Sequence, residues 1–309
     1  MASQFWRVLL GCQLLYAAAI TAAIAASVSP TAVTVLLVAL AAGASAPGVL
    51  AAGSYALSYA AGRGERAPAT SGRRGRLSDR LRALLCESLA FGWATRVMIA
   101  EPYQRPQRAE PPTRASAARP VLLIHGIVCN RGVWRPLLPR LRALGFAPVR
   151  AVNLEPLRGD IEWYAASVVE ELRRLQRESN GAPVAIVAHS MGGLVARAAL
   201  RSVGPEVISR IVTIGSPHHG TVTARLFRSS AARQMRPDSP WLSALNAGQE
   251  GRLPVPVTSI YSLQDNLIAP ARSAVLQGAR LHELRGLGHL SLLRARQSLD
   301  RVLAALART

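Results

Sequence analysis

The sequence predicts an α/β protein with a mostly parallel sheet covered by helices on both faces, preceded by two apolar helices. Three observations carry this prediction. Short apolar runs alternate with helical patterns from residue 121 to residue 307; one run, 183–188, leads into a tight turn and a helix; and two long uncharged stretches precede residue 63. Alternating strands and helices are typical of a parallel sheet buried between helical layers.

The charge and the cysteine content of the chain bear on its partners and its compartment. The chain has 309 residues, of which half are hydrophobic, and its 37 basic residues, all arginine, outnumber 17 acidic ones to give a net charge of +20. An arginine-only, alanine-rich chain first suggests a GC-rich genome, which is a codon effect. The functional alternatives are nucleic acid and an anionic membrane surface, and we find no nucleic-acid-binding motif, which favours the membrane. The three cysteines, Cys12, Cys86 and Cys129, are isolated, which predicts neither a metal site nor a disulfide framework and fits a reducing compartment.

Two uncharged stretches near the N-terminus predict a membrane anchor. No charged residue occurs in 8–29 or in 31–62, and each run exceeds the ~20 residues that a helix needs to cross a bilayer. Only a short segment around Pro30 separates them, so residues 1–62 are expected to form a two-span hairpin. The alternative is a pair of alanine-rich helices buried in a soluble protein.

The arginines predict the orientation of this hairpin. Arg7 precedes the first run, the connection carries no charge, and five arginines follow the second run: Arg63, Arg66, Arg73, Arg74 and Arg76. The positive-inside rule then places both ends in the cytoplasm, as expected for a bacterial inner-membrane protein. In an alternative, the first run is a signal peptide cleaved near residues 23–25, and the second still stops transfer. Export of the whole domain remains open if neither run stays in the membrane.

Residues 63–117 are expected to link the hairpin to a catalytic domain at 118–309. The segment 63–76 is rich in arginine and glycine, and 101–120 is rich in proline and arginine. Between them, 77–100 has the leucine spacing of a helix, with Ser78 as the expected N-cap. This helix suits a membrane interface and packing against the main domain equally well.

Within 118–309, strands and helices are expected to alternate, with one irregular insert. The expected strands are 121–124, 148–154, 183–188, 207–214, 255–263 and 280–284, and the expected helices are 134–144, 161–178, the segment after residue 190, and 290–307. Residues 223–251 have no clean period, and we expect them to form a mobile cap over the site.

The turn between strand 183–188 and the following helix predicts a nucleophile. Ser190 lies between two small residues, Ala188 and Gly192, in the A-x-S-x-G form of the nucleophile elbow. Small residues are needed at these positions because the strand and helix backbones nearly touch there. The alternative is an ordinary serine at a helix N-cap.

A serine hydroxyl needs a histidine to take its proton and a carboxylate to orient that histidine. In sheets of this kind the three groups follow the chain order serine, acid, histidine. Asp265 follows strand 255–263, and His289 lies between the strand at 280–284 and the last helix, so both have the required order and place. Taken singly, Asp265 could make an Asx turn and His289 could cap a helix.

Three other residues are kept as reserve candidates. Asp238 lies in the irregular insert and is the reserve acid. His218 and His219 follow a strand end and are the reserve bases.

Two backbone N–H groups are expected to bind the oxyanion that forms during acyl transfer. One belongs to Met191, directly after the nucleophile, and the other to Ile127, in the turn after the first strand. We find no glycine-rich phosphate loop, dinucleotide fingerprint or metal-ligand cluster, so neither a cofactor nor a metal is expected.

These motifs resemble those of the α/β-hydrolase superfamily, and within it bacterial lipases and esterases that carry A-H-S-M-G-G. The matching stretches are L-I-H-G (123–126), A-H-S-M-G-G (188–193), G-S-P-H-H-G-T (215–221), Y-S-L-Q-D-N-L-I (261–268) and G-L-G-H-L-S-L-L (286–293). The stretch S-P-W-L-S-A-L-N (239–246) resembles part of the lid region of such enzymes. The resemblance covers 118–309 and implies an α/β-hydrolase fold and carboxyl-ester hydrolysis by Ser190, Asp265 and His289.

The leading hypothesis is therefore a membrane-anchored serine carboxylesterase or lipase that draws an acyl ester or lipid from the bilayer. One alternative on the same fold is an acyltransferase, which passes the acyl group to an alcohol in place of water. Another is a non-catalytic membrane scaffold that keeps the elbow as a relic of the fold.

Overall fold

The computed structural model describes residues 2–27, 32–62, 76–101, 119–249 and 251–308, with the backbone alone at 25, 27, 32–40, 42 and 44. Its strands are β1 (Val121–Ile124), β2 (Val149–Val152), β3 (Val184–His189), β4 (Ile208–Ile214), β5 (Val257–Ser262) and β6 (Arg280–Leu284). Its α-helices are α1 (Ala2–Ser27), α2 (Ala32–Gly62), α3 (Leu77–Ala100), α4 (Leu138–Ala143), α5 (Ile161–Glu178), α6 (Met191–Val203), α7 (Ser230–Gln234), α8 (Pro240–Ala247) and α9 (Arg296–Ala307). Short 3₁₀ helices are η2 (Arg131–Trp134), η3 (Val222–Leu226), η4 (Ala271–Ala274) and η5 (Ser291–Leu293).

The six described strands form one parallel sheet in the order β2-β1-β3-β4-β5-β6. Leu123 of β1, for example, lies opposite Ala151 of β2 and Val187 of β3. Because all the strands run the same way, their carboxyl ends meet at one edge of the sheet. The segments that follow β1, β3, β4, β5 and β6 therefore begin close together, which is where open α/β sheets bind their ligands.

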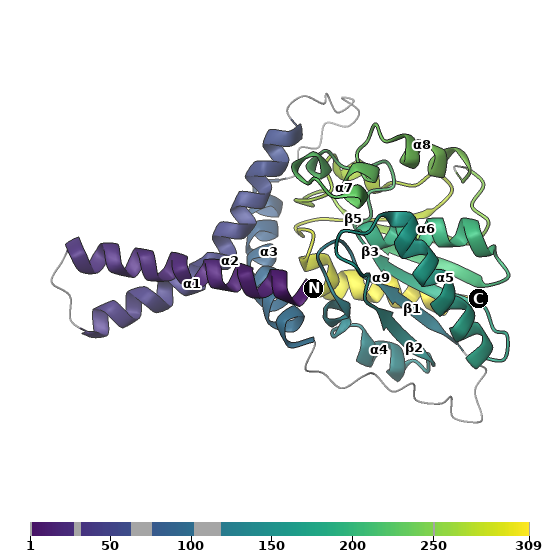
Figure 1. The fold of residues 1–309 in the computed structure, drawn as a ribbon, viewed down its shortest axis with the longest axis horizontal. Helices are drawn as coiled ribbons and strands as arrows, with labels where there is room; N and C mark the ends of the chain where they lie inside the picture. The colour runs from purple at the N-terminus through teal and green to yellow at the C-terminus, as the bar shows by residue number, and fades with distance from the viewer. Residues whose placement is uncertain (1, 28–31, 63–75, 102–118, 250, 309) are drawn as a thin grey trace.

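Helices cover both faces of the sheet (Figure 1). Leu122 and Ile124 of β1 pack into one core cluster with residues of α5 and α6. Leu123, which points to the opposite face, packs with residues of α3, α4 and α9. The apolar side chains of the strands are thereby removed from water on both sides, as the predicted α/β class requires.

Helix α3 has one buried and one exposed face. Ala83, Ala90, Ala94 and Met98 are fully buried, and the last three belong to the core cluster that contains Leu123 of β1. On the other face, a row of leucines at every fourth position is 59–72% exposed: Leu77, Leu81, Leu85 and Leu89. One face of α3 thus packs against the main domain, which is one of the two arrangements that the sequence left open. The expected N-cap at Ser78 is wrong, because Arg76 occupies that position and makes no side-chain cap.

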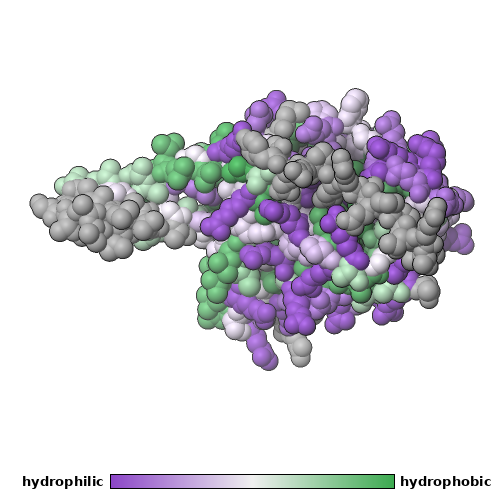
Figure 2. All heavy atoms as spheres, turned by 90° about the horizontal axis from the view of Figure 1, so that it is seen from below, coloured by the Kyte–Doolittle hydropathy of each residue, from purple (hydrophilic) through white to green (hydrophobic). Residues whose placement is uncertain are grey.

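Helices α1 and α2 form a hairpin that projects from the sheet domain, with the second half of α2 lying beside α3 (Figure 1). Residues 2–24 are long and apolar enough to cross a membrane, and only 6% of their most apolar window is buried. Residues 77–100 pass the same test, and 39% of that window is buried. Hydrophobic side chains gather along the hairpin and on the body beside its base (Figure 2).

Two expected helices are interrupted. The predicted helix 134–144 divides into η2 and α4, because Pro136 lies between them and cannot donate a helical hydrogen bond. The predicted helix 290–307 divides into η5 and α9, with Ala295 extended at φ −65° and ψ 127°. The insert 223–251, for which no period was evident, contains η3, α7 and α8.

The packing of α3 predicts a large difference between two truncations on the same helix. Met98→Ala removes a fully buried side chain and should lower the free energy of unfolding by about 2–5 kcal/mol, through lost burial and the cavity left behind. Leu85→Ala, at a position 63% exposed, should change it by less than about 0.5 kcal/mol. Denaturant unfolding of the full chain in detergent measures both; equal effects would show that α3 is not part of the core.

Candidate active site

Ser190 lies in a strained turn between β3 and α6. Its φ of 56° and ψ of −129° are values that non-glycine residues rarely adopt, and they turn its side chain out of the line of the strand. Its N–H donates to the carbonyl of Ile214 at 2.9 Å, which ties the turn to the end of β4. The residue is 6% exposed. This is the geometry that the A-x-S-x-G pattern predicts.

Two glycines allow the backbone to approach Ser190 this closely. A Cβ atom at Gly192 would lie 2.6 Å from the carbonyl oxygen of Ile124 and 2.7 Å from that of His125. A Cβ atom at Gly126 would lie 2.7 Å from the Cβ of Ser190. Such contacts with backbone cannot be relieved by rotating a side chain, so the elbow depends on glycine at both positions.

Asp265 and His289 form a buried pair. The Nδ1 atom of His289 lies 2.9 Å and 3.1 Å from the two carboxylate oxygens of Asp265. The Oδ1 atom of Asp265 also accepts the N–H groups of Leu267 and Ile268, each at 2.8 Å, which fixes the plane of the carboxylate. Asp265 is 8% and His289 2% exposed. With Nδ1 facing the acid, the Nε2 atom is the ring nitrogen left to exchange a proton.

His289 differs from the other buried histidines in its electrostatic environment. Burial by itself lowers the pKa of His289, but the charge of Asp265, its hydrogen bond and the charge of Glu87 outweigh burial, so the pKa is raised. Burial lowers the pKa of His125 to about 4, and burial and neighbouring positive charge lower those of His189 and His218. His289 is therefore the histidine of this set that is best suited to accept a proton.

Ser190 and His289 lie on adjoining segments without a direct hydrogen bond. The ring of His189, next to Ser190 in the chain, lies 4.5 Å from the ring of His289, centroid to centroid, and its Nε2 lies 3.3 Å from the carbonyl oxygen of His289. Among the described residues no hydrogen bond joins the hydroxyl of Ser190 to the imidazole of His289. Such contacts are often long in unliganded enzymes and shorten when the substrate binds.

The two expected oxyanion donors lie in the turns on either side of Ser190. Ile127 is in the turn after β1, and Met191 is the first residue of α6. In the described part of the chain neither N–H group donates to another residue, so both remain free for a ligand. The turn continues through Val128, whose φ of 59° is unfavourable for a β-branched residue, and whose carbonyl accepts the indole N–H of Trp6 at 2.8 Å.

The reserve candidates lie elsewhere. The side chain of Asp238 is 70% exposed and faces Arg225 at 3.6 Å on the surface. His218 is fully buried, and its Nε2 lies 3.0 Å from the hydroxyl of Thr213. His219 lies 3.5 Å from the side-chain amide of Asn246, on the cap. The acid that contacts a histidine is thus Asp265.

Sequence reasoning missed two residues that hold the loop of His289. The side-chain oxygen of Asn266 accepts the N–H of His289 at 2.8 Å, and Glu87 of α3 accepts the N–H groups of Leu290 and Ser291, both at 2.9 Å. One signal was present for Glu87, because it is the sole acidic residue between 80 and 100 in the sequence. Nothing local paired it with a segment 200 residues away.

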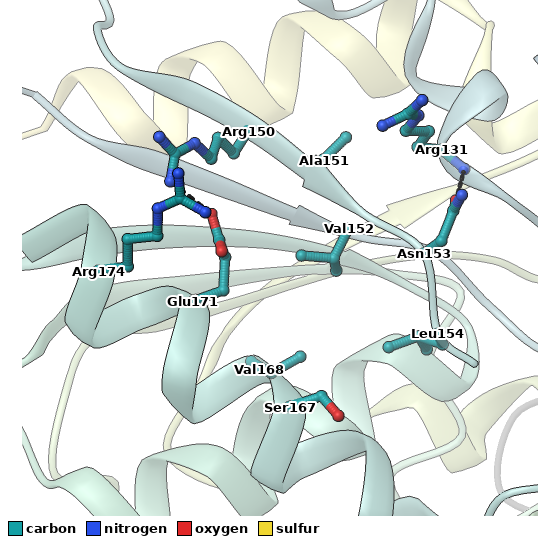
Figure 3. Close-up of a pocket in the computed structure, with 10 residues that line it drawn as sticks. All are labelled: Arg131, Arg150, Ala151, Val152, Asn153, Leu154, Ser167, Val168, Glu171 and Arg174. Carbon is teal, nitrogen blue, oxygen red and sulfur yellow. Dashed lines mark hydrogen bonds and ion pairs between the residues drawn. The ribbon is translucent and has the colours of Figure 1, made fainter. Parts of the chain in front are cut away.

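A pocket of about 550 Å³ lies away from these residues, between β2 and α5 (Figure 3). None of the predicted site residues lines it. Its arginines are paired: Arg150 donates to Glu171 at 2.7 Å and to Glu178 at 2.5 Å, and Arg174 donates to Glu178 at 3.1 Å. Because these charges are compensated, we do not assign a site to it. Among the described residues no group of three or more His, Cys, Asp or Glu is placed to hold a metal ion.

Comparison with known proteins supports the fold. The family described as alpha/beta hydrolase fold matches residues 119–234. A triacylglycerol lipase of Pseudomonas fragi is 27% identical over 146 residues, which are 41% of this chain and 47% of that protein, so the match spans about half of the lipase. The family match, 119–234, includes Ser190 but neither Asp265 nor His289.

Two solved structures have a similar fold. Lipase B of Aspergillus fumigatus aligns with a TM-score of 0.58 and 20% identity, over 66% of this chain and 56% of that one. The mature lipase BlEst2 of Bacillus licheniformis aligns with a TM-score of 0.55 and 17% identity, over 66% of this chain and 96% of that one. Together with the matched family, they identify the sheet and its covering helices as an α/β-hydrolase fold.

Proposed function

We propose that the protein is a membrane-anchored serine hydrolase that cleaves carboxyl esters of lipid-like substrates, with Ser190, His289 and Asp265 as its catalytic triad. The observation that carries this proposal is the buried pair of His289 and Asp265 on the loops that follow β5 and β6, at the same sheet edge as the strained Ser190. A serine on such a turn, with an oriented histidine on a neighbouring loop, is what acyl transfer requires.

In the proposed reaction, the Oγ atom of Ser190 attacks the carbonyl carbon of the ester while its proton passes to Nε2 of His289. Asp265 holds the ring by Nδ1 and stabilises the imidazolium. The N–H groups of Ile127 and Met191 stabilise the oxyanion. The tetrahedral intermediate collapses, the alcohol leaves with the proton from His289, and the acyl group stays on Ser190. Water then attacks the acyl carbon while His289 takes its proton. The bond to the Ser190 oxygen breaks, that oxygen receives the proton from His289, and the carboxylic acid leaves.

Three features support a lipid-like substrate and a membrane location. Residues 2–24 are apolar enough to span a bilayer. Beside the hairpin, α3 exposes its row of leucines next to the exposed Arg76, Arg80 and Arg82, a composition suited to the surface of an anionic membrane. A relative that is 27% identical over 146 residues is a triacylglycerol lipase. With the positive-inside rule, we propose that the catalytic domain faces the cytoplasm.

The nucleophile can be tested by covalent labelling. A fluorescent fluorophosphonate should label the wild-type protein and leave Ser190→Ala unlabelled, because only an activated serine attacks phosphorus at a useful rate. Ser216→Ala, at a buried serine near the elbow, is the matched control and should retain labelling. The variants that are labelled should hydrolyse p-nitrophenyl esters, and the unlabelled Ser190→Ala should not. Equal labelling of wild type and Ser190→Ala would rule out this site, and added alcohols that trap the acyl group would indicate a transferase.

The raised pKa of His289 predicts the acid limb of the pH profile. The histidine accepts a proton only when neutral, so kcat/KM should rise with pH through a pKa above the ordinary ~6.5 of histidine. Asp265→Asn should lower kcat by about 10⁴-fold, since the ring then loses its preferred tautomer. His282→Gln, on β6 and away from the pair of Asp265 and His289, should leave both kcat and the acid limb of the kcat/KM profile unchanged. A limb at or below pH 6 in the wild type would contradict this assignment.

The membrane anchor predicts a difference between two arginine substitutions. Leu15, near the middle of α1, is 72% exposed, and an arginine there should cost about 2.5–3.5 kcal/mol of insertion. The wild type should remain in the membrane pellet after carbonate washing, and Leu15→Arg should increase the released fraction. Leu226→Arg, at a position 49% exposed on η3, should leave the released fraction unchanged. Release of the wild type by carbonate would contradict the anchor.

A further inference from the structure

The loop that carries His289 is held by a helix outside the part of the chain that matches the hydrolase family. Glu87 of α3 directs its two carboxylate oxygens at this loop. Oε1 accepts the N–H of Leu290, and Oε2 accepts the N–H of Ser291, each at 2.9 Å. These are the two residues directly after His289, so Glu87 is hydrogen-bonded to the backbone immediately beside the candidate base.

The surroundings of Glu87 fit it closely. The residue is fully buried. A Cβ atom at Gly288 would lie 2.5 Å from Oε2 of Glu87 and 2.8 Å from Oδ1 of Asn266, so the carboxylate fills the space that the glycine leaves open. A buried carboxylate is costly unless it is well hydrogen-bonded, and here the two backbone N–H groups offset part of that cost. The arrangement therefore ties α3 to one conformation of the loop.

A second brace holds the same loop from α2. Oδ1 of the fully buried Asn266 accepts the N–H of His289 at 2.8 Å, while its Nδ2 donates to the hydroxyl of Ser54 at 2.6 Å. The hydroxyl of Tyr55 donates to the carbonyl of Gln264 at 2.9 Å. Residues 288–291 are thus held on one side by α3 and on the other, through Asn266, by α2.

We propose that Glu87 is a positioning residue for catalysis, which sets the place of the His289 ring relative to Ser190 by binding the backbone of residues 290 and 291. This inference rests on the proposed role of His289 as the base. Glu87 touches neither the reacting atoms nor a substrate. Its contribution is geometric, and displacing a catalytic group by about 1 Å is enough to cost about 100-fold in rate.

The test is to count active sites and rate separately in Glu87→Gln. Glutamine keeps the shape of the side chain, but its amide nitrogen must face a backbone N–H that now has no acceptor. Titration to completion with a fluorophosphonate counts the competent sites, and ester hydrolysis per titrated site then gives kcat and KM. We expect kcat per site to fall at least tenfold with KM changed less than about threefold. Glu170→Gln, on the exposed face of α5, is the matched control and should equal the wild type.

The outcomes separate this inference from the proposed function. If Ser190→Ala is labelled like the wild type, the proposed function fails. If Ser190→Ala is unlabelled and Glu87→Gln keeps its kcat per titrated site, the positioning role alone is overturned. This holds even if Glu87→Gln has fewer titratable sites than the wild type. Should Glu87→Gln yield no sites, Glu87→Asp keeps the charge but shortens the reach to the two N–H groups and should show the same loss of kcat per site. Absence of sites in both variants would assign Glu87 to folding only and overturn the proposal.

Discussion

The buried contact between His289 and Asp265 sets conditions that much of the surrounding structure has to meet. A carboxylate removed from water is tolerated only when its lone pairs are satisfied, and the N–H groups of Leu267 and Ile268 do this for Asp265. The imidazole must also be held from its backbone, because a free loop would let the ring rotate away. Asn266 supplies that restraint at the N–H of His289. The pair is thus the centre of a small polar network inside an apolar domain, and each of its members has a partner.

The elbow imposes a second condition at the same sheet edge. Ser190 occupies a backbone conformation that costs free energy, and it persists because neighbouring groups determine it from several sides. Its N–H is bound by Ile214, its preceding strand is paired on both edges, and α6 starts at once behind it. The strain is offset by the parallel sheet as a whole. This explains why the local sequence carries so clear a pattern: small residues are the sole means of fitting three backbone segments together at Gly192.

These two conditions differ in how far they can be predicted from the sequence. The elbow is local, so β3, Ser190 and Gly192 were evident from the consecutive residues 183–194. The order of Asp265 and His289 followed from strands that alternate along the chain. The partners of the His289 loop are not local: Glu87 lies about 200 residues away and Ser54 more than 210 residues from Asn266. No period or motif encodes such a pairing.

The contacts of the N-terminal helices make them part of the site's architecture. Trp6 of α1 binds the carbonyl of Val128 in the expected oxyanion turn, Ser54 of α2 binds Asn266, and Glu87 of α3 binds the loop of His289. Each helix therefore contacts a different one of the loops that carry the candidate machinery. The hairpin that we propose to anchor the protein is continuous with these contacts through α1 and α2. The hairpin is thus hydrogen-bonded both to the expected oxyanion turn and to the loop of Asp265.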